Sequence, residues 1–340
     1  MKRGILPTLS GLVLLICLTG CSNKNGYIKI DATNFPDYAF RSRISANYDA
    51  DQDGYLSPEE IKKTTEIHVA SGGIADLKGV EFFESLQYLD CSGNRLTELD
   101  LSANKELIGL DCSVNLLEHL DLSSTPKLSE LSFSECPIAE VDLSKCPQLT
   151  RLNCKGSSLT ELDLSKNEEL TYLDFSNTFV ETFDTAYNTK LEMLLCQNSE
   201  LRHLEVNQSP DLKQLYCSSC NLDGLYLKYN TNLLELDCSG NLLTTLDVSQ
   251  NSKLTILRCA DNSLKRINLA RNEELEELDI RSASLSELDV SQNRKLLTIE
   301  CEDNDFKELD IRNNSKLTSV DLDEDVKVLG ERDDVTINRR

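Results

Sequence analysis

Leucine returns with a strict 21-residue period over most of this 340-residue chain, and this spacing constrains the fold more than any other feature. The recurring leucines, which mark position 1 of each repeat, are Leu86, Leu107, Leu128, Leu149, Leu170, Leu191, Leu212, Leu233, Leu254, Leu275, Leu296 and Leu317. No insertion or deletion interrupts them, so residues 86–316 form eleven full repeats and a truncated repeat follows. A period of this length indicates a solenoid, in which each repeat stacks on the next.

The pattern inside each repeat predicts strands. Positions 4 and 6 are apolar and alternate with polar positions 3 and 5, and positions 14 and 16 alternate with polar positions 13 and 15. Alternation at every second position is typical of a strand. A single repeat has too few apolar residues to bury its own face, so its neighbours must cover it. We therefore expect a β-rich solenoid with two extended segments in each turn.

Eight cysteines fall at position 6 of the repeats. They are Cys91, Cys112, Cys154, Cys196, Cys217, Cys238, Cys259 and Cys301. Other repeats carry Phe, Ile or Leu at this position, which indicates a buried apolar site, and a free cysteine behaves as a small hydrophobe. Cβ atoms on adjacent rungs would lie about 5 Å apart, which is long against the roughly 3.8 Å usual in a disulfide. We therefore expect buried free thiols rather than disulfides, zinc ligands or redox groups. For the off-repeat cysteines Cys136, Cys146 and Cys220, the oxidation state stays open.

The N-terminal end of the chain, residues 1–21, carries the signals of export. Lys2 and Arg3 precede an apolar run that is short for a bilayer span. The run ends in Leu18-Thr19-Gly20-Cys21, which resembles the lipobox of bacterial lipoproteins. This resemblance implies a signal peptide over residues 1–20, lipidation of Cys21 and a short tether over residues 21–26. An ordinary secretory signal or an uncleaved anchor is the alternative.

Residues 27–85 lack the repeat and are expected to form a small helical cap that shields the first rung. The apolar spacing predicts a helix over about 36–47. An irregular first rung is expected to lead into the solenoid over residues 86–329, and residues 330–340 are expected to form a polar tail.

The cap contains the stretch DADQDGYLSPEE, residues 49–60, which matches the calcium loop of an EF-hand. The predicted ligands are Asp49, Asp51 and Asp53, the backbone carbonyl of Tyr55, Ser57 through a water, and Glu60. Because the chain has one such loop, we expect one structural calcium ion that clamps the cap. The alternative is a polar loop without metal, since Ser57-Pro58-Glu59-Glu60 is also the capping box of a helix start.

The repeat L-x-x-L-x-C-S-x-N-x-L-T-x-L-D-L-S-x-N resembles the cysteine-bearing 21-residue repeats of internalin J and related bacterial surface proteins. The cap, with its EF-hand-like loop, resembles that of bacterial leucine-rich-repeat lipoproteins. The resemblance covers residues 27–329. It implies a curved right-handed leucine-rich-repeat array, a parallel β-sheet on its concave face, and display at the cell surface as a binding or adhesion module.

Charge and composition exclude several functions. The net charge is −23, which disfavours nucleic acid and adsorption to anionic lipid. Membrane attachment is therefore expected through the N-terminal lipid alone.

No catalytic group of residues is expected. The serines recur at fixed repeat positions, which explains them without catalysis, and His119 and His203 lie four rungs apart. The protein is therefore interpreted as a non-enzyme.

A change in the outward-facing strand residues predicts where a partner binds. Most rungs carry polar residues at these positions, but the middle rungs carry Tyr172, Met193, Leu195 and Tyr216, followed by Ile256 and Arg258. Tyr and Arg are enriched in binding hot spots, and Met adapts to varied partners. We expect a monomeric protein that binds a protein or glycoprotein through this concave patch. Its expected location is the bacterial cell surface or outer membrane, rather than a position facing the periplasm. Scattered surface residues of no consequence are the alternative for the patch, and a structural subunit of an envelope complex is the alternative function.

Overall fold

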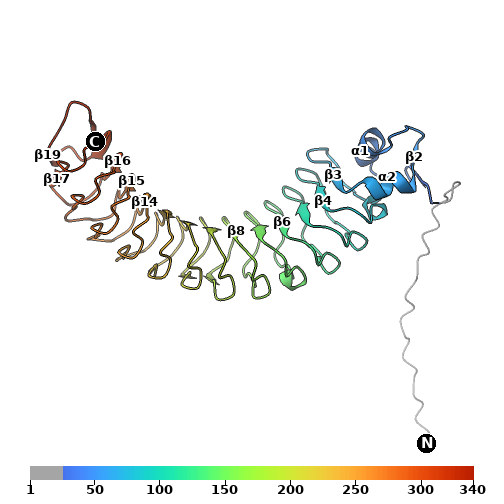
Figure 1. The fold of residues 1–340 in the computed structure, drawn as a ribbon, viewed down its shortest axis with the longest axis horizontal. Helices are drawn as coiled ribbons and strands as arrows, with labels where there is room; N and C mark the ends of the chain where they lie inside the picture. The colour runs from blue at the N-terminus through green and yellow to red at the C-terminus, as the bar shows by residue number, and fades with distance from the viewer. Residues whose placement is uncertain (1–25) are drawn as a thin grey trace, which may run out of the picture.

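The computed structural model describes residues 26–340 as a curved solenoid, shown as an arc with the cap at its N-terminal end (Figure 1). The predicted signal peptide, Cys21 and nearly all of the tether lie outside the described residues. Figure 1 shows the strands along the inner edge of the arc. No helix among residues 26–340 is long and apolar enough to cross a membrane. The expected leucine-rich-repeat solenoid with a parallel sheet on its concave face is confirmed.

A 14-stranded parallel sheet forms this inner edge. The strands are β3 (Glu66–His68), β4 (Tyr88–Asp90), β5 (Gly109–Asp111), β6 (Glu130–Ser132), β7 (Arg151–Asn153), β8 (Tyr172–Asp174), β10 (Met193–Leu195), β12 (Gln214–Tyr216), β13 (Glu235–Asp237), β14 (Ile256–Arg258), β15 (Glu277–Asp279), β16 (Thr298–Glu300), β18 (Ser319–Leu322) and β20 (Thr336–Arg339). The end strands β3 and β20 lie outside the repeats and add to the two edges of the sheet. From β4 to β18 the strands begin at position 3 of a repeat, and neighbouring strands pair with an offset of one repeat, as Tyr88 does with Gly109. The repeat spacing in the sequence is thus the register of the sheet.

The second extended segment of each turn forms strands in only a few repeats. β9 (Thr182–Asp184) pairs with β11 (His203–Glu205), and β17 (Glu308–Asp310) pairs with β19 (Lys327–Leu329). In the other described repeats this segment contains no assigned strand, so the expectation of two strands in every turn was too general. A short 3-10 helix, η2 (Leu143–Lys145), occupies part of it in one repeat.

The position-6 cysteines lie in the core between the two segments. All eleven cysteines among the described residues are buried and free. Several thiols donate to the backbone carbonyl of the next rung, as Cys112 does to Ser132 at 3.4 Å and Cys301 to Asp321 at 3.2 Å. The thiols therefore fill the core and also form hydrogen bonds from one rung to the next.

Buried asparagines tie most rungs to their neighbours at the turns. At position 9, Asn94 donates from Nδ2 to the carbonyls of Val69 at 3.0 Å and Cys91 at 2.9 Å. At position 19, Asn251 donates from Nδ2 to the carbonyls of Leu227 at 3.1 Å and Asn230 at 2.9 Å. Each amide thus satisfies backbone groups that the turn would otherwise leave buried and unpaired.

The cap covers the first rung. It contains β1 (Ile28–Lys29), α1 (Tyr38–Tyr48), β2 (Tyr55–Leu56), α2 (Pro58–Lys63) and η1 (Val80–Phe82). The ring of Phe35 packs edge-on against Phe40 and Phe82, with centroids 5.9 and 5.7 Å apart. Asp37 caps α1 by accepting from the Phe40 N–H at 2.9 Å, which places the helix slightly later than the predicted 36–47.

The other end of the solenoid is closed by residues that were expected to form a polar tail. Within residues 330–340, β20 adds a last strand to the sheet by pairing with β18, Ser319 opposite Thr336. Val335 is buried and Ile337 packs against the core, so apolar residues in this short segment cover the last rung. The alternation of apolar and polar residues in this segment is only a few residues long. For this reason the strand could not be recognised among the charged residues.

Candidate functional site

The calcium-type loop joins α1 to α2 and brings three of the four predicted carboxylates together. Ligand oxygens of Asp49, Asp51 and Asp53 all lie within 4.8 Å of one another. This is the one such group of three or more potential metal ligands that the described part of the chain contains. Hard carboxylate oxygens are the donors that Ca²⁺ prefers.

Backbone N–H groups hold Asp49 in place at the centre of the loop. Its Oδ2 accepts from Gly54 at 3.0 Å and its Oδ1 from Asp53 at 3.2 Å. Gly54 has a φ of +81°, a conformation that favours glycine. Asp49 is only 4% exposed, and burial raises its pKa, with the charges of Glu60 and Asp51 adding to the effect. The ionised form of Asp49 is therefore unfavourable at this position unless a nearby cation compensates its charge.

Glu60 and Ser57 form the capping box of α2 and close the loop. The Glu60 carboxylate accepts from the Ala50 N–H at 2.7 Å and from the Ser57 N–H at 2.8 Å, while Ser57 Oγ accepts from the Glu60 N–H at 3.2 Å. Burial opposes ionisation of Glu60, but these hydrogen bonds outweigh it and its pKa is lowered. Glu60 is thus ionised, but it lies outside the group of ligand oxygens that the three aspartates form. The three aspartates are therefore the carboxylates that fit a divalent cation directly.

The loop is also bonded to an N-terminal strand that the sequence analysis did not predict. β1 pairs with β2 in antiparallel fashion, Ile28 opposite Leu56, and the Ile30 N–H donates to the Gly54 carbonyl at 3.0 Å. Tyr55, whose carbonyl is a predicted ligand, lies in β2. Strands as short as these two show no period in the sequence.

The predicted partner-binding residues all lie on the sheet and point away from the core. Tyr172 pairs with Met193, and Leu195 pairs with Tyr216, so these four residues form one continuous patch over β8, β10 and β12. All four are partly exposed. Strand β13, which carries Glu235 and Asp237 on the same face, separates them from the remaining two predicted residues, Ile256 and Arg258.

Neighbouring charged residues hold the side chains of this patch. The Arg151 guanidinium lies over the Tyr172 ring, and the Tyr216 hydroxyl donates to Glu235. Burial, with the Glu235 carboxylate beside it, raises the pKa of Tyr216 to about 12. Arg258 is paired with Glu277 at 2.8 Å, so its charge is already neutralised within the chain. The four contiguous residues are therefore the better candidates for a contact surface.

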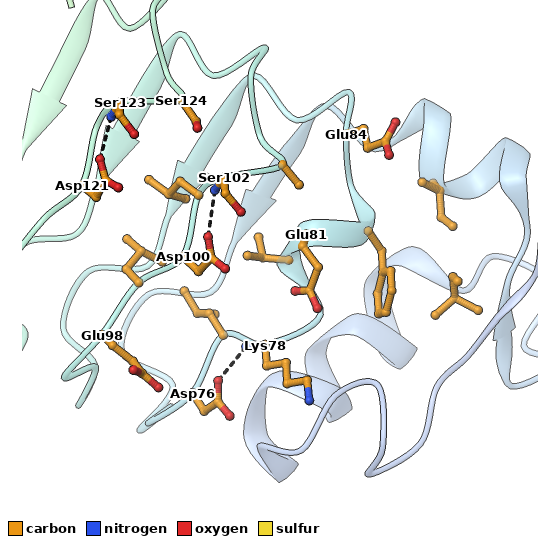
Figure 2. Close-up of a pocket in the computed structure, with 18 residues that line it drawn as sticks. Asp76, Lys78, Glu81, Glu84, Glu98, Asp100, Ser102, Asp121, Ser123 and Ser124 are labelled. Atoms are coloured by element: carbon orange, nitrogen blue, oxygen red, sulfur yellow. Dashed lines mark hydrogen bonds between the residues drawn. The ribbon is translucent and has the colours of Figure 1, made fainter. Parts of the chain in front are cut away.

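A groove of about 920 Å³ lies where the cap meets the first two repeats (Figure 2). Its cap side includes Ile28, Ile61 and Phe82, and its array side includes Leu99 and Asp100. Sequence reasoning missed it because residues far apart in the chain form it. Figure 2 shows Asp100 and Asp121 on the array side, each bonded to the serine at the second position after it.

Comparison with known proteins agrees with the repeat geometry. The Leucine Rich Repeat family profile matches residues 85–107. Internalin J of Listeria monocytogenes serotype 4b (strain F2365) is 34% identical over 70 residues, a match that covers 21% of this chain and 8% of that protein. In sequence, therefore, the match spans a small part of the length of that curated relative.

Two solved structures extend the similarity to most of the chain. The functional domain of InlJ from Listeria monocytogenes, described as including a cysteine ladder, superposes with a TM-score of 0.72 at 30% identity, covering 87% of this chain and 76% of that one. The internalin InlF from the same species has a TM-score of 0.82 at 22% identity, covering 90% and 96%, which shows the fold. This chain belongs to the internalin-like leucine-rich-repeat proteins.

Proposed function

We propose that this protein is a non-enzymatic binding and adhesion module of the bacterial cell envelope, which engages a protein or glycoprotein through its concave face. The observation that carries the proposal is the continuous patch of Tyr172, Met193, Leu195 and Tyr216 on the inner sheet. Large, partly exposed aromatic and flexible apolar side chains in the middle of a concave surface are typical of a binding hot spot. Proteins with internalin-like repeats are interaction modules, which supports the same role here.

In this proposal, one Ca²⁺ bound by Asp49, Asp51, Asp53 and Glu60, with the Tyr55 carbonyl and a water on Ser57, clamps the cap. The ion would compensate four carboxylates in one loop and connect α1, β2 and α2. Its role is structural, because the loop lies in the cap and the patch lies in the middle rungs. A lipid on Cys21, outside the described residues, would hold the monomer at the cell surface or outer membrane.

The test uses the chain from Ser22 to Arg340, in calcium, against mucin, epithelial cells and a detergent extract of the bacterium's own envelope. A patch variant carries Tyr172→Ser, Met193→Ser, Leu195→Ser and Tyr216→Ser. A matched control carries Leu116→Ser, Tyr226→Ser, Tyr229→Ser and Leu242→Ser, which removes two exposed tyrosines and two exposed leucines outside the sheet.

Binding to mucin or cells that the patch variant loses and the control keeps is the expected result. Capture of an envelope protein alone, with no binding to mucin or cells, would replace the adhesin proposal with that of a structural subunit of an envelope complex. Equal loss of binding in both variants would contradict the assignment of the concave patch as the binding surface.

A further inference from the structure

The groove between the cap and the first two repeats (the cap groove) is chemically unlike the concave patch. Four of the residues that line it, Ile28, Ile61, Phe82 and Leu99, are partly buried apolar residues packed against the core. Its volume of about 920 Å³ is at the upper end of the roughly 300–1,000 Å³ range of ligand-binding pockets. The groove is therefore open to a partner, and apolar side chains form part of its lining.

Carboxylates surround this apolar floor. The acidic residues that line the groove are Asp76, Glu81, Glu84, Glu98, Asp100 and Asp121, and Lys78 is the one basic residue among the lining residues. Figure 2 labels all seven and shows them coming from both the cap and the array. Several are fixed by local backbone bonds, such as the 2.8 Å bond from the Ser123 N–H to Asp121.

None of these six carboxylates forms an ion pair with a lysine or arginine within residues 26–340. Elsewhere the array neutralises acids across adjacent rungs, as Lys190 does with Glu169 at 2.5 Å and Lys213 with Glu192 at 2.7 Å. The rim formed by these six carboxylates therefore carries a negative charge that is not paired by any lysine or arginine side chain of the described residues.

The spacing of these carboxylates favours a polypeptide over a metal ion. No three of them bring oxygens within 4.8 Å of one another, since the loop aspartates are the one such group in the described chain. A single ion could not use them together, whereas separate basic side chains on one segment could. We propose that the cap groove binds a basic amphipathic segment of a protein partner, with its apolar side on Ile28, Ile61, Phe82 and Leu99 and its Lys or Arg side chains at the rim.

This second binding surface is independent of the concave patch. The probe is a synthetic peptide of leucine and lysine at helical spacing, carrying a fluorophore for anisotropy and a photo-crosslinker for mapping. A leucine and glutamate peptide controls for charge, and a serine and lysine peptide of equal charge controls for the apolar side. All measurements are made on Ser22 to Arg340 in calcium, so that the cap is in one state.

The groove variant carries Glu98→Gln, Asp100→Asn and Asp121→Asn. The matched control carries Glu287→Gln, Asp289→Asn and Asp247→Asn, which are the same positions of two later repeats, away from the cap. Both remove three negative charges, and the new amides keep an oxygen that can accept the local backbone bonds. Similar melting temperatures for the two variants and the parent chain show that both fold.

We expect the groove variant to bind the leucine and lysine peptide about tenfold more weakly, since it loses three partly exposed ion pairs that are each weak. The control variant should bind within about twofold of the parent chain, because distant exposed charges are screened. Crosslinks should map to the cap and the first two repeats. Equal weakening by both variants, equal binding of the serine and lysine peptide, or crosslinks confined to other surfaces would each overturn the proposal.

Discussion

The guanidinium carbon of Arg151 lies 4.2 Å from the centroid of the Tyr172 ring. The two residues face each other across adjacent strands, β7 and β8, and the contact holds the tyrosine at one end of the concave patch. The patch is therefore partly ordered before any partner arrives, which lowers the entropy cost of binding.

A double-mutant cycle of Arg151→Ala and Tyr172→Ala, followed by urea unfolding, should give a coupling of about 0.5–1 kcal/mol. This is the energy typical of a cation on an aromatic face at an exposed site. Arg151→Ala combined with Tyr88→Ala is the control, because Tyr88 lies three rungs away and the two changes should add. A coupling indistinguishable from zero in the first cycle would mean that the contact does not order the patch.

Removal of calcium should lower the melting temperature of the chain. If calcium exceeds its dissociation constant a hundredfold, its binding adds about 2.7 kcal/mol of stability. Scanning calorimetry with calcium and with a chelator measures the difference. Asp51→Asn removes one predicted ligand charge and should shrink that difference. An identical melt in calcium and chelator would refute the structural calcium ion.

Replacing Asn251 by alanine should lower the free energy of unfolding by roughly 2–4 kcal/mol, because it leaves the buried carbonyls of Leu227 and Asn230 unpaired. Asn251→Ser should cost less. At the equivalent position of another repeat, Ser209 donates from Oγ to the Asn188 carbonyl at 2.8 Å. Urea titration of the two variants compares them, and a loss below about 1 kcal/mol for alanine would contradict the role assigned to the amide.

The thiols of the folded chain should resist alkylation. Burial raises the pKa of Cys146 to about 11 and that of Cys217 well above its usual value, so little thiolate is present at neutral pH. Mass spectrometry of Ser22 to Arg340 after maleimide treatment should find no label in buffer and eleven labels in urea without reductant. Nine labels in urea would reveal a disulfide and contradict the free thiols.

The solenoid could be predicted because a strict 21-residue period is repeated eleven times, so that each strand and buried cysteine follows from the one before. Structural features that occur only once in the chain were harder to predict from the sequence. β1 and β20 are short strands whose partners, β2 and β18, cannot be identified from local alternation, and the cap groove joins Ile28 to Leu99 only in space. The calcium loop lies between these cases, because the spacing of Asp49, Asp51 and Asp53 within one segment suffices to bring their oxygens together.

The constant offset of one repeat between paired strands of the sheet from β4 to β18 also makes the array adjustable in length. Each interface between rungs repeats the same contacts, so a whole repeat removed from the middle leaves the cap and β20 with neighbours of the same kind. The inner edge would then shorten by one strand spacing, about 4.8 Å. The reach of such a protein can thus change in uniform increments during evolution, because the loss of a whole repeat keeps every following leucine in the core.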